Sequence, residues 1–187
     1  MSSRIVTITG GARSGKSAHA AKIVAEVGAP VVYLATASAS DTEMAGRIEQ
    51  HRAERPSNWL TLEEPIHLSS ALSQANLPEP SAILVDCITV WLGGYVCPLY
   101  DMPEAEALAS LKSVEEAVFA EAQRLFEFAR GRSGCLVVVT NEVGDGIVPA
   151  DPLTRFYRDT LGRLNQKFAA SSDEVYVLVA GLPLRLK

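Results

Sequence analysis

The segment TITGGARSGKSAHAAK, residues 7–22, carries the strongest signal in this chain. Its residues 10–17 read G-G-A-R-S-G-K-S and match the pattern G-x-x-x-x-G-K-[ST], with a β-branched run before them and a helical pattern after them. Glycines let backbone amides turn toward phosphate oxygens, and the first turn of the next helix adds unpaired N–H groups. The segment therefore predicts a nucleotide phosphate-binding loop between a strand and a helix.

The chemistry of such a loop assigns roles to particular side chains. Lys16 is expected to reach the β- and γ-phosphates, and the Ser17 hydroxyl to ligate Mg²⁺. A second Mg²⁺ ligand usually ends a neighbouring apolar strand, and AILVDCIT (82–89) supplies Asp86 there; a structural acid at a strand end is the alternative. Glu142 also follows an apolar run, and its role stays open. The expected nucleotide contacts in the loop are Gly10, Gly11, Ala12, Arg13, Ser14, Gly15, Lys16 and Ser17.

Strand and helix patterns alternate along the chain. Continuously apolar, β-branched runs predict strands at 4–9, 30–36, 82–89, 135–143 and 174–181, with a short edge strand at 182–187. Helical patterns occupy 17–27, 40–55, 102–132 and 151–170. Runs without polar alternation are typical of parallel strands covered on both faces. The expectation is one domain over residues 1–187 with an α/β, P-loop NTPase-like (RecA-like) fold: a mostly parallel sheet with helices on both faces.

Composition narrows the function classes. The net charge of −5 argues against a general nucleic-acid or anionic-membrane surface, so no nucleic-acid partner is expected. No apolar run approaches the roughly 18 residues that a membrane span needs. The apolar run near the N-terminus is also too short for the core of a signal peptide. Three cysteines without C-x-x-C spacing favour free thiols in a reducing compartment. A cytoplasmic location is expected.

A phosphate loop alone leaves motors, switches and transferases open. A GTPase switch would carry an Asn-Lys-x-Asp element, and the comparable strand end TNEVGDG (140–146) lacks that lysine and the later aspartate. In EQHRAERP (49–56), His51 and Arg55 are four residues apart and share a helix face with Arg47. A neutral imidazole can attack phosphorus and hold a nucleotide as a phosphoramidate, flanked by arginines. From these residues alone, the simpler interpretation is that His51 is a solvated histidine in a charged helix.

Several segments in order along the chain resemble one known family. They are ITGGARSGKSAHA (8–20), YLAT (33–36), DTEMAGRIEQHRAERPSNWLTLEEP (41–65), LVDCITVWL (84–92) and the C-terminal stretch 139–187, which begins VTNEVGDGIVP. Together they resemble the bifunctional adenosylcobinamide kinase/adenosylcobinamide-phosphate guanylyltransferases of cobalamin synthesis. The combination of the loop, H-x-x-x-R-P and N-E-V-G-x-G-I-V-P is far more specific than any one of these motifs.

The resemblance implies roles for residues outside the loop. His51 would be the residue guanylylated by GTP, with Lys16 as the second catalytic residue. ATP or GTP would donate the phosphate, and a corrinoid would be the small-molecule substrate of a homo-oligomer, a trimer or larger. Further nucleotide contacts implied by position are Thr36, Ala37, Ser38, Ala53, Glu54, Arg55, Pro56, Glu63 and Asp86.

One departure from the family pattern concerns the helix after the third predicted strand. The pattern often has Ser-Asn after WL, whereas this chain has Gly93-Gly94. No contact is therefore carried over from the family at these two positions. Two alternative functions remain at this point: a monofunctional P-loop kinase of small molecules, in which His51 is incidental, and a non-catalytic nucleotide-binding switch.

Overall fold

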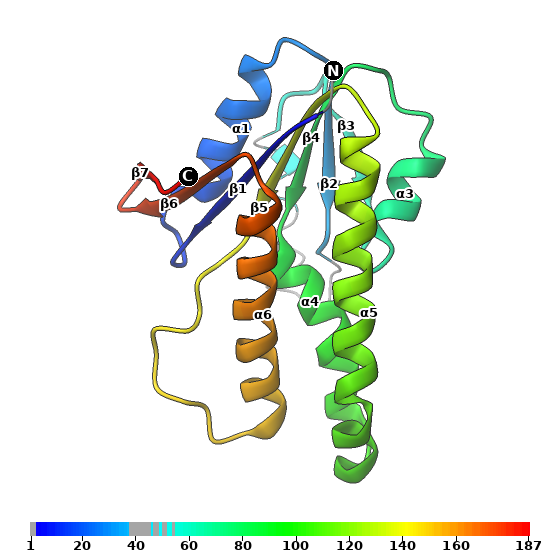
Figure 1. Ribbon diagram of the computed structural model, residues 1–187, viewed down its shortest axis with the longest axis vertical. Helices are drawn as coiled ribbons and strands as arrows, with labels where there is room; N and C mark the ends of the chain where they lie inside the picture. The colour runs from blue at the N-terminus through cyan, green and yellow to red at the C-terminus, as the bar shows by residue number, and fades with distance from the viewer. Residues whose placement is uncertain (1–2, 38–45, 47–48, 50–51, 54) are drawn as a thin grey trace.

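A seven-stranded sheet forms the centre of the molecule (Figure 1). The structure, a computed structural model, describes residues 3–37, 46, 49, 52–53 and 55–187. The strand order is β3-β2-β4-β5-β1-β6-β7; all neighbours pair in parallel except β6 and β7, which are antiparallel. The strands are β1 (Arg4–Gly10), β2 (Val31–Ala35), β3 (Leu60–Glu63), β4 (Ser81–Asp86), β5 (Gly134–Val139), β6 (Glu174–Val179) and β7 (Leu182–Arg185).

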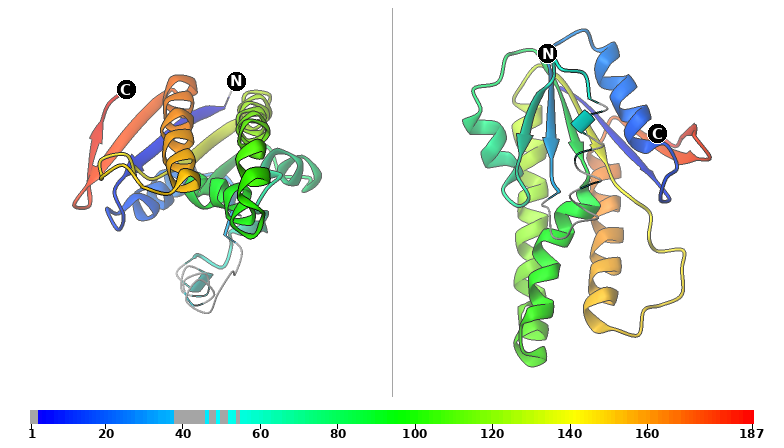
Figure 2. Two further views of the ribbon diagram at one scale, coloured as in Figure 1. Left: turned by 90° about the horizontal axis from the view of Figure 1, so that it is seen from below. Right: turned by 180° about the vertical axis from the view of Figure 1, so that it is seen from behind.

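Helices cover both faces of this sheet (Figure 2). One face carries α1 (Lys16–Glu26), which packs on β1, β4 and β5. The other carries α3 (Leu68–Gln74), α4 (Ile88–Val96), α5 (Glu104–Arg130) and α6 (Pro152–Ser171), with the 3₁₀ helix η1 (Cys97–Asp101) between α4 and α5. No described helix is long and apolar enough to cross a membrane.

The central strands are apolar on both sides, as their continuous sequence runs predict. In β4, Ile83 and Val85 join the core beneath α4, α5 and α6, whereas Ala82 and Leu84 join the core beneath α1. Burying apolar side chains on both faces is the main favourable term that holds the layers together. The mostly parallel α/β fold with helices on both faces is therefore confirmed.

Several boundaries differ from the sequence-based prediction. The run 82–89 stops being a strand at Asp86, and α4 begins at Ile88, because a short apolar run does not by itself separate strand from buried helix. The run 135–143 ends as a strand at Val139, and the chain then forms a loop outside α6 (yellow in Figure 1). β3 was not predicted. It is only four residues long, it lies at one edge of the sheet, and most of its residues are exposed. The edge strand near the C-terminus is confirmed as β7.

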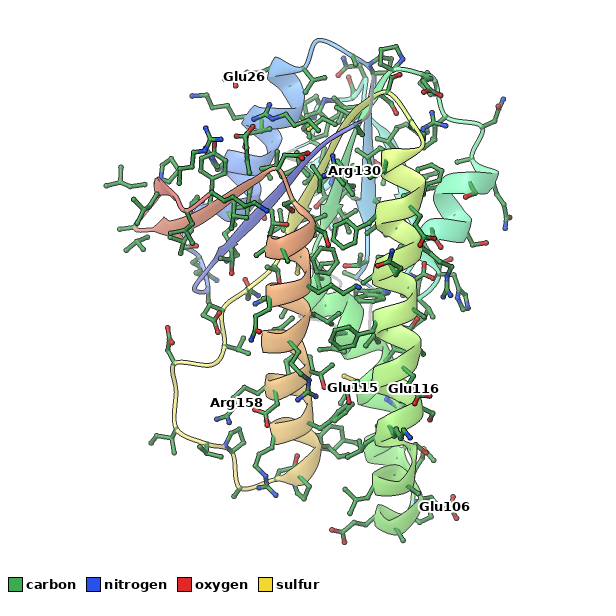
Figure 3. All side chains as sticks on the ribbon, viewed as in Figure 1. Glu26, Glu106, Glu115, Glu116, Arg130 and Arg158 are labelled. Atoms are coloured by element: carbon green, nitrogen blue, oxygen red, sulfur yellow. The ribbon has the colours of Figure 1, made fainter. Side chains whose placement is uncertain are left out.

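Both long helices fall within two residues of their predicted ends, and α6 begins with a capping interaction. Asp151 accepts a hydrogen bond from the backbone N–H of Thr154 at 2.7 Å, and Pro152 occupies the first helical position. The helix predicted at 40–55 lies largely outside the described residues. At the C-terminal end of α5, Arg130 (labelled in Figure 3) makes two hydrogen bonds, at 2.8 and 2.9 Å, to the carboxylate of Asp173. Asp173 lies just before β6.

Candidate active site

The phosphate loop joins β1 to α1, and its backbone requires glycine at two points. Gly10 has φ +146°, and a Cβ there would lie 2.5 Å from the carbonyl oxygen of Leu178 in the adjacent strand β6. Gly15 has φ +96°, in the left-handed region, and is the N-cap of α1. The loop therefore lies tightly against β6 and leads directly into the helix N-terminus, where backbone N–H groups favour an anion.

Lys16 holds its ammonium across this loop. It is 7% exposed, and its Nζ donates to the Gly11 carbonyl at 2.6 Å and lies 3.5 Å from the Ser14 Oγ. Burial lowers the pKa of the Lys16 ammonium, and the nearby Asp86 carboxylate opposes that shift. Its hydrogen-bond partners are neutral loop groups, so phosphate oxygens, which carry the opposite charge, can replace them as stronger partners.

Asp86 ends β4 on the same side of the molecule, with β5 lying between β4 and β1. The Tyr33 hydroxyl donates to its Oδ2 at 2.9 Å. Burial and the Asp86 charge both raise the pKa of Tyr33, so this phenol stays protonated and acts as a donor. Thr36 fixes the turn after Asp86, because its Oγ1 donates to the Cys87 carbonyl at 2.8 Å and accepts from the Cys87 N–H at 2.9 Å.

Arg55 lies over Tyr33, the hydrogen-bond partner of Asp86. Its guanidinium carbon is 3.6 Å from the centre of the Tyr33 ring, a cation–π contact. Its buried Nε has no hydrogen-bond partner among the residues that the structure describes. Arg55 and Pro56 line one pocket of about 780 Å³ together with the phosphate loop and Asp86. The predicted site residues that this pocket brings together are Ala12, Arg13, Ser14, Gly15, Lys16, Ser17, Arg55, Pro56 and Asp86.

A smaller pocket of about 320 Å³ adjoins the first one and shares Arg55, Pro56 and Trp59 with it. Glu63, another predicted contact, lines this second pocket, and its carboxylate pairs with Arg52. The nucleotide contacts expected from two separate parts of the sequence thus lie along one continuous surface.

The remaining predicted residues are distributed differently. Thr36 is buried and contacts the chain after Asp86, Ala37 is half-buried, and Ala53 is exposed. Three predicted site residues lie outside the described part of the chain: Ser38, Glu54 and the predicted nucleophile, His51. Glu142 does not line either pocket: its exposed carboxylate accepts the Gly144 N–H at 2.8 Å and caps its own turn.

Sequence reasoning missed seven residues that line the larger pocket, among them Tyr33, Trp59 and Asn141. Trp59 is half-buried and lines both pockets. Tyr33 could have been found from the sequence, because it is a tyrosine within a run of aliphatic residues. A buried hydroxyl needs a hydrogen-bond partner, so such a residue indicates a polar group nearby. Trp91, by contrast, is a packing residue: it is fully buried and donates from its indole nitrogen to the Ile66 carbonyl at 2.9 Å.

The family model and the curated relatives agree on one family. Residues 6–186 match the family described as cobinamide kinase / cobinamide phosphate guanyltransferase. The chain is 38% identical over 183 residues to the bifunctional adenosylcobalamin biosynthesis protein CobU of Escherichia coli (strain K12), covering 98% of this chain and 99% of that one. It is 41% identical over 180 residues to the bifunctional adenosylcobalamin biosynthesis protein CobP of Pseudomonas aeruginosa (strain PAO1), covering 96% and 95%. Among solved structures, a RadB recombinase matches with a TM-score of 0.47 and 15% identity, covering 93% of this chain and 73% of that one.

Proposed function

This chain belongs to the cobinamide kinase / cobinamide phosphate guanyltransferase family, and we propose that both reactions run at the pocket between its phosphate loop and Arg55, with His51 as the guanylylated residue. It is a bifunctional kinase and guanylyltransferase of cobalamin biosynthesis. One observation carries the assignment to a single site. The phosphate loop, the strand-end acid Asp86 and the arginine of the H-x-x-x-R-P motif line one pocket of about 780 Å³.

In the first reaction, the aminopropanol hydroxyl of adenosylcobinamide attacks the γ-phosphorus of ATP or GTP. The bond from that phosphorus to the β,γ-bridging oxygen breaks, the nucleoside diphosphate leaves, and the hydroxyl proton passes to solvent. Lys16 stabilises charge on the β- and γ-phosphates, and the loop amides and the N-terminus of α1 hold the phosphate oxygens. Positioning and charge stabilisation supply most of the catalysis in phosphoryl transfer.

Mg²⁺ fits the donor set at this site. The Ser17 hydroxyl belongs to the first turn of α1, and the Asp86 carboxylate uses only Oδ2 for its described hydrogen bond to Tyr33. A hydroxyl, one carboxylate and substrate phosphates are the oxygen ligands that Mg²⁺ commonly takes in nucleotide sites. Once bound, the ion would neutralise charge that builds on the phosphate oxygens.

In the second reaction, an imidazole nitrogen of His51 attacks the α-phosphorus of GTP, and the bond to pyrophosphate breaks. An oxygen of the substrate's new phosphate then attacks that phosphorus, the P–N bond breaks, and adenosylcobinamide-GDP leaves with His51 restored. Two findings support the role of His51: the family match, and the presence at the pocket of Arg55, four residues further along the chain. Arg55 would stabilise charge on the α-phosphate during both steps.

The remaining expected contacts form part of the same proposal. Thr36, Ala37 and Ser38 would lie beside the nucleotide after β2, and Ala53, Glu54, Pro56 and Glu63 would line its far side. We also propose that a single domain spanning residues 1–187 carries both activities and acts in the cytoplasm, where nucleoside triphosphates are made.

We further propose that the enzyme is a homo-oligomer, a trimer or larger. The antiparallel hairpin β6–β7 forms one edge of the sheet and exposes four large apolar side chains: Val179, Leu182, Leu184 and Leu186, each at least 60% exposed. Exposed apolar clusters of this kind mark association surfaces, and an open strand edge is a ready template for a partner.

The test of this function is product analysis. Purified protein is incubated with adenosylcobinamide, Mg²⁺ and either ATP alone or ATP with GTP, and the corrinoids are separated and identified by mass. Adenosylcobinamide phosphate is expected with ATP alone, and adenosylcobinamide-GDP once GTP is added. Accumulation of the phosphate in both mixtures would indicate a monofunctional kinase, and an unchanged corrinoid in both would indicate a non-catalytic nucleotide binder.

A further inference from the structure

A further cavity, of about 390 Å³, lies between α4, η1 and α6, and Thr36 is the one proposed nucleotide contact among its described lining residues. Its lining is mostly apolar, with Val90, Gly93, Val96 and Cys97 on one side and the aromatic ring of Tyr157 on the other. In Figure 2, α4 runs beside α6 in both views, and the two helices are in contact. The cavity therefore belongs to the helical layer just beyond the ends of the parallel strands, where ligands collect in open α/β sheets.

Residues that line this cavity are hydrogen-bonded directly to residues that line the phosphate pocket. Thr36 lines the cavity and is hydrogen-bonded in both directions to Cys87, which lines the phosphate pocket. Thr89 lines the cavity, and its Oγ1 accepts the N–H of Asn141, which again lines the phosphate pocket, at 2.8 Å. A ligand seated in the cavity would thus lie next to Cys87 and Asn141, which line the phosphate pocket together with Asp86.

The chemistry of the lining does not suit a phosphate. None of the described residues that line the cavity is charged. The Tyr157 hydroxyl donates to the Thr89 carbonyl at 2.9 Å and keeps lone pairs free to accept, whereas the Thr89 hydroxyl is already bonded to Asn141 and to the Cys87 sulfur. A free acceptor within an apolar wall matches the N–H of a neutral secondary amide flanked by methyl groups.

Gly93 keeps this cavity open. A Cβ built at Gly93 would meet one described atom, the Cys97 Sγ, at 4.0 Å, so the space beside it is empty. Gly94 differs: a Cβ there would lie 3.1 Å from both the Ile66 side chain and the Pro65 carbonyl, so that glycine serves close packing. A side chain at position 93 would therefore enter the cavity without displacing backbone.

We propose that this cavity is the acceptor subsite, which holds the amide-linked aminopropanol arm of the corrinoid and the adjoining methyl-bearing edge of its ring. The inference rests on the proposed function for the identity of the acceptor. The cavity volume admits only this arm and edge, and the rest of the large ring remains outside. Seated there, the terminal hydroxyl of the arm is directed toward Asp86 and the phosphate loop, and the nucleotide stays in its own pocket.

The direct test fills the cavity at Gly93. Cobinamide binding is measured by equilibrium dialysis, without turnover, for wild type, Gly93→Ala and Gly93→Leu. We expect the dissociation constant to rise with side-chain size, by about 10-fold or more for leucine, because the arm and the new side chain need the same space. Affinity for GTP should not change. Gly162→Leu is the matched control: it lies on α6, and a Cβ there meets nothing within 4 Å.

Equal cobinamide affinity in Gly93→Leu and Gly162→Leu would overturn the assignment, and so would a loss of GTP affinity, which would make the cavity part of the nucleotide site. Product analysis of the wild type separates the two proposals. If wild type makes no corrinoid product but binds cobinamide in a Gly93-dependent way, the proposed function fails and the subsite stands.

A second measurement needs no variant. Cys97 is exposed at the cavity, whereas Cys87 and Cys135 are more buried, and burial raises both of their pKa values to about 11. A maleimide should therefore modify Cys97 first, because the thiolate is the reactive form and Cys97 is accessible. Cobinamide should slow this modification about 10-fold at saturation, and GTP alone should not. Modification of Cys97 at the same rate with saturating cobinamide would contradict the subsite.

Discussion

Lys16 is buried and hydrogen-bonded to the loop carbonyl of Gly11, so its ammonium is in place before any nucleotide binds. If one pocket serves both reactions, Lys16→Ala should lower kcat/KM about 100-fold or more for kinase turnover and for guanylylation alike. Both rates are measured with labelled nucleotides. Lys22→Ala, an exposed change on the same helix, is the control and should leave both rates near wild type. Normal guanylylation in Lys16→Ala would mean that the second reaction has a separate nucleotide site.

Tyr33 connects the two halves of the site, since its hydroxyl holds Asp86 and its ring supports Arg55. Tyr33→Phe keeps the ring but frees the carboxylate to rotate. We expect the Mg²⁺ concentration for half-maximal kinase activity to rise several-fold and kcat to fall about 10-fold, as for other groups that orient a metal ligand. Tyr95→Phe, which removes a hydroxyl bonded to the Ile66 carbonyl away from the site, is the control. An unchanged Mg²⁺ dependence in Tyr33→Phe would exclude this positioning role.

Single residues of the site were predictable to the extent that their chemistry is local in sequence. The loop and Lys16 follow from one short motif, and Asp86 follows from its place at the end of an apolar run. The contact of Arg55 with Tyr33 was not predictable, because it depends on which strands become neighbours. Strand order is set by tertiary packing, so no spacing along the chain encodes the partnership.

At the scale of elements, the end of α5 is tied to the start of β6 by Arg130 and Asp173, and Asp173 also accepts the Ile5 N–H of β1 at 2.7 Å. The hydrogen bonds from Arg130 lower the pKa of Asp173. Because the folded-state pKa is depressed, this stabilisation is fully present above the ordinary aspartate pKa and is lost as the pH falls through the lowered one.

Asp173→Asn should therefore lower the free energy of unfolding by about 1 kcal/mol at pH 7, a modest value because the pair is partly screened by solvent. The difference from wild type should stay constant down to about pH 5 and narrow below about pH 4. Urea denaturation across this pH range measures it, with the exposed change Asp159→Asn on α6 as control. A difference that does not vary with pH would show that Asp173 acts through packing rather than charge.

Elements with long, periodic or continuously apolar patterns were the predictable ones, such as α5, α6 and the five central strands. β3 escaped prediction because four half-exposed residues carry little pattern, and β4 was extended too far because the apolar run continues into α4. Both misses border the site: Glu63 ends β3, and Thr36 bonds the turn between β4 and α4.

At the scale of the whole molecule, the exposed apolar edge at β6–β7 should govern assembly. The double change Leu182→Asp and Leu184→Asp places charges on this edge and is expected to shift the protein from an oligomer to a monomer in light scattering coupled to gel filtration. Leu60→Asp, at the opposite edge of the sheet, is the control and should leave the assembly intact. A monomeric wild type, or an oligomer that survives the double change, would contradict this surface assignment.

The central claim, that the chain carries guanylate on a histidine, is tested most directly by covalent labelling. Wild-type protein is incubated with GTP labelled at the α-phosphate, without corrinoid, then denatured, treated with acid or base, and digested. The account predicts one labelled peptide containing His51, lost in acid and stable in base as expected of a phosphoramidate, and absent in His51→Ala while that variant still phosphorylates cobinamide. Label of normal stoichiometry in His51→Ala, or none in the wild type, would contradict it.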